Sequence, residues 1–198
     1  MLRRVILFAA LFPSAAGAAA QVVCALGTGS SAYKPAEDQR PTPDALELAG
    51  RVNAAVKSIC KDSCPTIALF RNASAANVML IANAGQAKLV YAPQFLAAAY
   101  EAFGDGGVMA LMAHELGHAL DDTLGAAWIK TAWQPELRAD AWAGCVLARV
   151  NLEASDAEST IEALAKYPGP AQSSWDLRLP AFRTGFSECG GDASKLGK

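Results

Sequence analysis

The sequence predicts an α+β fold in which a small antiparallel sheet packs on a mostly helical core. Short runs rich in β-branched and aromatic residues gather between residues 66 and 91, as in short strands joined by turns. Before and after this region, apolar residues recur three or four positions apart, which is the spacing of helices that bury one face. At 198 residues the chain is long enough for one compact domain and too short for two.

The first 20 residues have the pattern of a signal peptide. Arg3 and Arg4 precede an apolar run over residues 5–12, and three alanines at 18–20 offer a cleavage site. The run is too short for a stable anchor, although an uncleaved anchor is the alternative, and no later run has the length of a membrane span. We therefore expect a periplasmic or secreted protein with no stable membrane span after cleavage.

Residues 21–43 are polar, contain glycine and serine, and end among prolines, which predicts a loosely ordered lead-in. The main domain is expected over residues 44–190 and starts with a helix over 44–59, for which Asp44 is the candidate cap. Three strands follow at residues 66–70, 77–81 and 88–91.

The rest of the domain is predicted to be helical. A helix over 93–103 ends at a glycine-rich segment, and a second helix runs over 108–121. Pro135 stands where a helix starts, and that helix continues to about residue 152. Two more helices and a flexible C-terminal tail are expected, at residues 155–166, 174–186 and 191–198.

Charge argues against a nucleic acid as partner. The formal net charge of −2 becomes −4 when residues 1–20 are removed, because they hold two arginines and no acids. No basic stripe or cluster exists to neutralise phosphates.

The chain has five cysteines: Cys24, Cys60, Cys64, Cys145 and Cys189. In an exported protein we expect disulfides, and an odd number leaves at least one cysteine unpaired. The expected pairs are Cys60 with Cys64, across a short loop, and Cys145 with Cys189, which would clamp the chain end onto a central helix. The alternative is a structural zinc site of four thiolates, but such sites usually use two short cysteine spacings and only one is present.

Two histidines, His114 and His118, are the only ones in the chain, and they lie four residues apart on one predicted helix. This spacing puts both imidazoles on one face, as two ligands of a single metal ion require. Glu115 projects about a quarter-turn away, so it can act as general base on a metal-bound water without binding the metal. The rival interpretation is a helix that carries these residues by chance, but their burial on an apolar helix is costly unless they are paired.

A catalytic zinc ion needs a third protein ligand, and no histidine is left to provide it. The longer HExxHxxGxxH pattern is excluded, because Asp121 stands at its glycine position and Leu124 at its third-ligand position. The ligand must be a carboxylate. Glu136, near the start of the next helix, is the best candidate.

Asp140 follows this glutamate by one turn on the same helix face. It could accept the second N–H of His114 or His118 and so fix the orientation of that ring. Asp121 and Asp122 are rivals for this role.

The segments HELGH at 114–118 and ELRAD at 136–140 together resemble the HExxH…ExxAD pattern of short-spaced gluzincin-type zinc metallopeptidases. Residues 88–147 are similar to the core of that family, which has an edge strand, the zinc helix and the Glu/Asp helix. The segment from Tyr167 to Arg178 is more faintly similar to a His-Pro…Arg element of related members, with Tyr167 at the histidine position.

The resemblance implies one zinc ion per chain and hydrolysis of peptide bonds by a metal-activated water. Glu136 would be the third ligand, Glu115 the general base and Asp140 the partner of a ligand histidine. The substrate would be a peptide or a flexible protein segment. Endopeptidase cleavage is favoured, because the chain has no long insertions to narrow the cleft.

Such an enzyme also needs a donor for the developing oxyanion. Tyr167 is the leading candidate, in a rigid proline-flanked turn, and Tyr91 and Arg178 are alternatives. The strand that ends near Tyr91 is expected to be the sheet edge that pairs with an extended substrate. Disulfide pairing is the expected state of the cysteines, but a thiolate from Cys24 could alternatively bind the zinc and keep the enzyme inactive.

Two other functions are compatible with the sequence. The first is a zinc hydrolase of another amide, for example in cell-wall peptides, which would use the same ligands. The second is a catalytically silent binding or chaperone-like module that retains the fold. The intact Glu115 argues against the second, because holding a metal does not require a general base.

Overall fold

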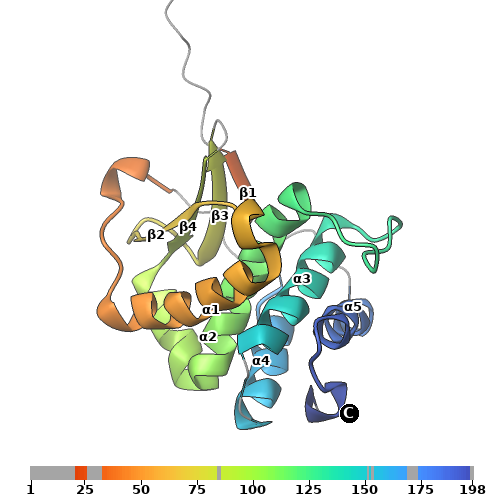
Figure 1. The fold of residues 1–198 in the computed structure, drawn as a ribbon. Coiled ribbons are helices and arrows are strands. Elements are labelled where there is room, and N and C mark those ends of the chain that lie inside the picture. Colours follow the sequence, from red (N-terminus) through yellow and green to blue (C-terminus); the bar gives the residue numbers. More distant parts are fainter. Residues whose placement is uncertain are drawn as a thin grey trace, which may run out of the picture.

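The chain folds into a small mixed sheet placed on a bundle of helices, which confirms the predicted α+β class (Figure 1). The computed structural model describes residues 21–25, 33–83, 86–150, 152, 154–168 and 174–196. The signal peptide expected over residues 1–20 lies outside the described residues.

The sheet has the strand order β1-β3-β4-β2. Its strands are β1 (Gln21–Ala25), β2 (Ile67–Arg71), β3 (Val78–Asn83) and β4 (Gln86–Tyr91). Strand β3 pairs antiparallel with both β1 and β4, whereas β2 runs parallel to β4.

This topology corrects two expectations about the sheet. The prediction of an antiparallel sheet is wrong for the β2–β4 pair, because the connection from β2 to β3 leaves a gap one strand wide and β4 returns from its hairpin to fill it. The prediction that the strand ending at Tyr91 is an edge is also wrong, because β4 lies between β2 and β3. On the side of the sheet away from β2, the outer strand is β1, which the sequence did not predict.

Five helices form the rest of the domain, and their positions agree with the apolar periodicity of the sequence (Figure 1). They are α1 (Pro43–Cys60), α2 (Pro93–Thr123), α3 (Pro135–Val150), α4 (Ala154–Lys166) and α5 (Trp175–Glu188). The predicted break in α2 is reduced to a kink at Gly104, whose φ of 59° is in the region that favours glycine. Asp44 is not the cap of α1: Pro43 takes the first helical position, and the Thr42 side chain accepts the Ala45 N–H.

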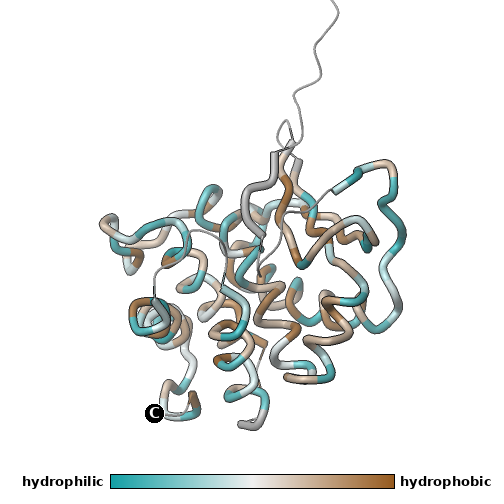
Figure 2. Tube along the Cα trace, turned by 180° about the vertical axis from the view of Figure 1, so that it is seen from behind, coloured by the Kyte–Doolittle hydropathy of each residue, from teal (hydrophilic) through white to brown (hydrophobic). Residues whose placement is uncertain are grey.

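Hydrophobic residues concentrate where the helices and sheet face one another, and the outer loops are more hydrophilic (Figure 2). The second half of α2, from Val108 to Leu120, is almost entirely buried in this core. None of the described helices is both long and apolar enough to cross a membrane.

Part of the lead-in is held against the sheet by Asp38, which follows a 3-10 helix, η1 (Pro35–Glu37). The Asp38 carboxylate accepts hydrogen bonds from Lys88 on β4, from Asn72 at 2.8 Å and from the Tyr33 hydroxyl at 3.0 Å. Residues 33–43 are therefore more ordered than their composition predicts, because these hydrogen bonds to Asp38 compensate for the lack of apolar side chains.

Both expected disulfides are present, Cys60–Cys64 and Cys145–Cys189. The second joins α3 to the residue that follows α5. The C-terminal segment was predicted to be a flexible tail, but residues 193–196 form the 3-10 helix η3 (Ala193–Leu196). Leu196 is 1% exposed and packs in the core, so a single apolar side chain anchors this segment.

Candidate metal centre

The two histidines lie one turn apart on the buried half of α2. His114 is fully buried and His118 is 6% exposed. Their ring centroids are 5.2 Å apart. The apolar residues around them bury this half of the helix, so both imidazoles are removed from water by the hydrophobic packing of α2.

Glu136, in the first turn of α3, faces both rings. Its Oε2 lies 3.3 Å from Nε2 of His114, and its Oε1 lies 3.5 Å from Nε2 of His118. One ligand atom from each of the three residues lies within 4.8 Å of the others, so the group could hold a metal ion. Ligands at about 2.0–2.1 Å from a tetrahedral ion are separated by about 3.3–3.4 Å, which is close to the two histidine–glutamate distances.

The Nε2 atom of His118 supplies a second test of the fit. It is buried, and it makes no hydrogen bond within the described residues. A buried nitrogen without a hydrogen bond is costly, and coordination of a metal would satisfy it.

Gly117 allows α3 to approach α2 closely enough for Glu136 to meet the histidines. A Cβ atom at Gly117 would lie 2.5 Å from the carbonyl oxygen and 3.0 Å from the Cα of Ala139. The backbone of α3, about one turn beyond Glu136, therefore fills the space beside Gly117.

Behind the ligands, a buried chain of polar contacts fixes the ring of His114. Oδ1 of Asp140 lies 2.9 Å from Nδ1 of His114. Arg178, on α5, donates to Asp140 through Nε and Nη2, both at 2.8 Å, and through Nη1 to the Leu164 carbonyl at 2.9 Å. Because an ionised Asp140 can only accept, this arrangement places the His114 proton on Nδ1 and leaves Nε2 to face Glu136.

The surrounding charges move the pKa values of the two histidines in opposite directions. Burial lowers the pKa of His114, but Asp140, Glu136 and Glu115 outweigh it and raise that pKa to about 9. Burial and the neighbouring His114 lower the pKa of His118 to about 4. His114 therefore holds a second proton, on the Nε2 that faces Glu136, and a bound metal would displace it. His118 is neutral, which is the form that binds metals.

The Glu115 side chain, between the two histidines in the sequence, reaches the sheet. It is fully buried, and its Oε2 accepts the backbone N–H of Leu80 on β3 at 2.8 Å. This contact fixes the orientation of the carboxylate beside the cluster. The sequence could not indicate it, because the donor is a backbone group whose side-chain identity is irrelevant.

The other predicted site residues lie elsewhere. Asp121 accepts a hydrogen bond from Arg138 at 2.6 Å, on the surface of the site, rather than from a histidine. The Tyr91 hydroxyl accepts the Thr42 N–H at 3.0 Å. Arg178, a candidate oxyanion donor, instead donates two hydrogen bonds to Asp140. The faint resemblance to a His-Pro…Arg element therefore indicated Arg178, but for a different role.

Tyr167 lies at the end of α4, and its ring packs edge-on against two phenylalanines of α2. The ring centroids lie 4.8 Å from that of Phe95 and 5.9 Å from that of Phe103. Both phenylalanines precede the kink at Gly104, whereas the histidines follow it. The role of Tyr167 as oxyanion donor therefore stays a prediction.

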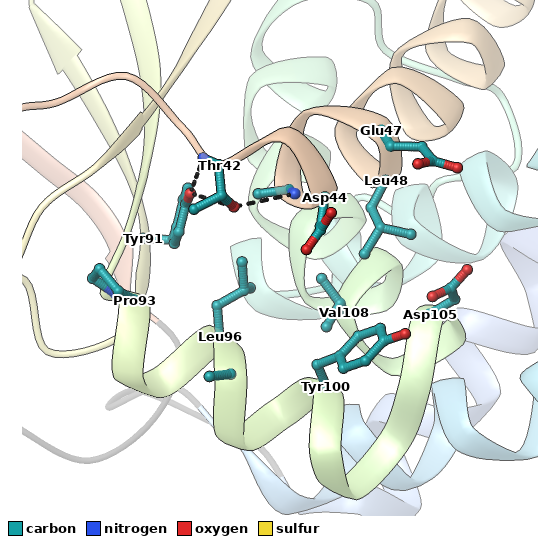
Figure 3. Close-up of a pocket in the computed structure, with 12 residues that line it drawn as sticks. Thr42, Asp44, Glu47, Leu48, Tyr91, Pro93, Leu96, Tyr100, Asp105 and Val108 are labelled. Carbon is teal, nitrogen blue, oxygen red and sulfur yellow. Dashed lines mark hydrogen bonds between the residues drawn. The ribbon is translucent and has the colours of Figure 1, made fainter.

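A separate cavity of about 510 Å³ lies between α1 and the first half of α2 (Figure 3). Leu48, Leu96 and Val108 contribute apolar lining, and Tyr91 is held at one end by its hydrogen bond to Thr42. None of the lining residues belongs to the histidine–glutamate cluster.

Comparison with protein-family models, with curated proteins and with solved structures finds no match to this chain.

Proposed function

We propose that the protein is an exported zinc metallopeptidase of the gluzincin type that hydrolyses peptide bonds in flexible segments. One observation carries the proposal. Two helices bring one ligand atom each of His114, His118 and Glu136 within 4.8 Å of one another, while Glu115 lies beside this cluster with its carboxylate turned to β3.

The donor set supports zinc as the ion. Two imidazole nitrogens and one carboxylate are a set found in catalytic zinc sites, which keep a fourth position open for water or substrate. When bound, zinc would lower the pKa of a water molecule and polarise the carbonyl of the scissile bond.

The chain's own residues have distinct tasks in this mechanism. The pair formed by Asp140 and Arg178 keeps the His114 proton on Nδ1, so that Nε2 is available as a ligand. Glu115 accepts the proton of the attacking water and then donates it to the leaving amine. The Leu80 N–H holds one oxygen of Glu115, which limits the motion of the carboxylate to positions beside the ligands.

The two disulfides support export, because such bonds persist in oxidising compartments and are rare in the cytosol. We therefore assign the protein to the periplasm or the extracellular space.

The test combines metal content with hydrolysis of a quenched fluorescent peptide library. Wild-type protein should hold about one zinc ion per chain. Glu136→Ala should lose the metal, whereas Glu115→Gln should keep it and lose at least about 10²-fold in rate. Glu101→Gln, an exposed position on α2, is the matched control and should match the wild type in both measurements.

Wild-type protein that takes up no zinc after supplementation would overturn the proposal. Undiminished hydrolysis by Glu115→Gln would overturn the assignment of the base. Zinc-loaded protein that cleaves cell-wall peptides but no protein segment would redirect the proposal to another amide substrate.

A further inference from the structure

Strand β1 lies along the edge of β3 (Figure 1). It pairs antiparallel with β3, from Gln21 opposite Ala82 to Ala25 opposite Met79, and it also contacts α2. Leu80, whose N–H binds Glu115, lies within this paired stretch, opposite Cys24.

The direction of the Leu80 N–H places Glu115 on the β1 side of β3. The Ala92 N–H donates to the Asn77 carbonyl at 2.8 Å, so this pair is a hydrogen-bonded pair of the β3–β4 ladder. Bonded and non-bonded pairs alternate in antiparallel sheets, so Leu80, three residues further along, directs its N–H away from β4. Strand β1 and the Glu115 carboxylate therefore approach the same edge.

The pairing of β1 is irregular where it passes the acid. The register shifts between Val22 and Cys24, so one extra residue lies in β1 opposite the step from Ile81 to Leu80. Such a bulge locally interrupts the ladder. The interruption coincides with the N–H that is committed to Glu115.

We propose that β1 occupies the place on β3 that an extended peptide takes, so that the chain covers its own site and a peptide binds by displacing β1. This inference deepens the proposed function, on which it rests for its effect on hydrolysis. The ligand is any segment that can adopt an extended backbone, because pairing uses main-chain groups.

The geometry makes β1 and a peptide mutually exclusive. A strand edge offers one row of N–H and C=O groups, so it accepts one partner at a time. A peptide cleaved with the help of Glu115 must bring its scissile carbonyl within the reach of a water bound to that carboxylate. A strand paired with β3 lies about 4.7–4.9 Å from it, and β1 already holds this position along the stretch of β3 that contains Leu80.

The length of β1 makes the displacement feasible. It comprises five residues, and the bulge removes part of its ladder. Short edge elements open locally at a small fraction of the free energy of global unfolding. Because β1 is tethered, it competes at an effective concentration on the order of millimolar, so free peptides bind weakly until it leaves.

The test uses the mature chain with Cys24→Pro, which removes the backbone N–H opposite Leu80, a residue whose main-chain groups face β1, and with Cys24→Ser as the matched control that keeps this N–H. The probe is a fluorescein-labelled peptide with the sequence of residues 21–25 and serine in place of the cysteine. Binding is measured by fluorescence anisotropy, and hydrolysis of the peptide library and zinc content are measured on the same samples.

Cys24→Pro should bind the probe about tenfold or more tightly than wild type and Cys24→Ser, as expected when a tethered competitor is removed. Its kcat/KM should rise by a similar factor at equal zinc content. Tighter binding without hydrolysis by any variant would support the strand displacement and sink the peptidase proposal. Equal binding by all three proteins, or a lower kcat/KM of zinc-loaded Cys24→Pro, would overturn the strand displacement.

A second measurement applies if Cys24→Pro fails to fold. Hydrogen exchange of residues 21–25 in the wild-type protein should accelerate when the probe is added at saturating concentration, because β1 is released. Probe binding that leaves this exchange unchanged would overturn the inference.

Discussion

Substitution of Gly117 by alanine tests whether the close approach of α2 and α3 sets the metal site. The added Cβ would lie 2.5 Å from the Ala139 carbonyl oxygen, whereas the shortest ordinary contact of this kind is about 3.3 Å. The helices must therefore separate by about 0.8 Å if neither bends. Backbone atoms form the obstacle, so no side-chain rotation can relieve it.

That separation carries Glu136 away from both histidines. Metal–ligand distances tolerate deviations of about 0.2 Å, so a displacement about four times larger should weaken zinc binding by at least about 10–100-fold. Overpacking should cost about 1–3 kcal/mol of the free energy of unfolding, and removal of a helical glycine returns about 1 kcal/mol. The variant should therefore remain folded.

The assay is competition for zinc with a chromophoric chelator, together with thermal unfolding. Gly50→Ala is the control, because Gly50 lies on the exposed side of α1 and an added Cβ meets nothing within 4 Å. It should keep wild-type zinc affinity and gain about 0.5–1 kcal/mol of stability. Wild-type zinc affinity in a folded Gly117→Ala protein would refute the reasoning.

Three further predictions concern other parts of the molecule. Asp140→Asn, which weakens the hold on the His114 ring, should lower zinc affinity by about 10–100-fold in the same competition assay; an unchanged affinity would contradict the role of the Asp140 contact. Replacement of Cys145 and Cys189 by alanine should lower the free energy of unfolding by about 4 kcal/mol, measured by urea titration, because the bond closes a loop of 44 residues; a loss below about 1 kcal/mol would contradict this. Burial raises the pKa of Asp38, but hydrogen bonds, led by that from Lys88, outweigh it and lower this pKa below the usual value. The contribution of Asp38 to stability is therefore present above its unfolded pKa of about 3.9 and is lost as pH falls through the folded pKa. The free energies of unfolding of wild type and Asp38→Asn, measured by urea titration, should differ at pH 7 and converge in strong acid.

The helices of this fold could be predicted because their signals are local. Apolar spacing located α1 and α3 to within two residues at each end, and Pro135 marked where α3 starts. The sheet could be predicted only in part, because pairing is not local. The parallel contact of β2 with β4 and the docking of β1 depend on partners far along the chain, which periodicity does not record.

The same distinction applies to the site. His114 and His118 belong to one helix, so their spacing alone places both rings on one face. Glu136 could be proposed because a short connection returns the chain beside them. Leu80 acts through its backbone, and Arg178 reaches Asp140 from 38 positions away, so nothing in their local sequence reports these contacts.

The support of Asp140 by Arg178 has a consequence for the order in which the protein is made. All three candidate ligands are synthesised before α5, which supplies the guanidinium that stabilises the buried carboxylate. A nascent or truncated chain that stops before Arg178 would contain every candidate ligand. It would still lack the guanidinium that holds Asp140, and through Asp140 the ring of His114, in place. The candidate metal centre is therefore expected to be completed late in biogenesis. Formation of the Cys145–Cys189 disulfide would then stabilise the packing of α5 against α3.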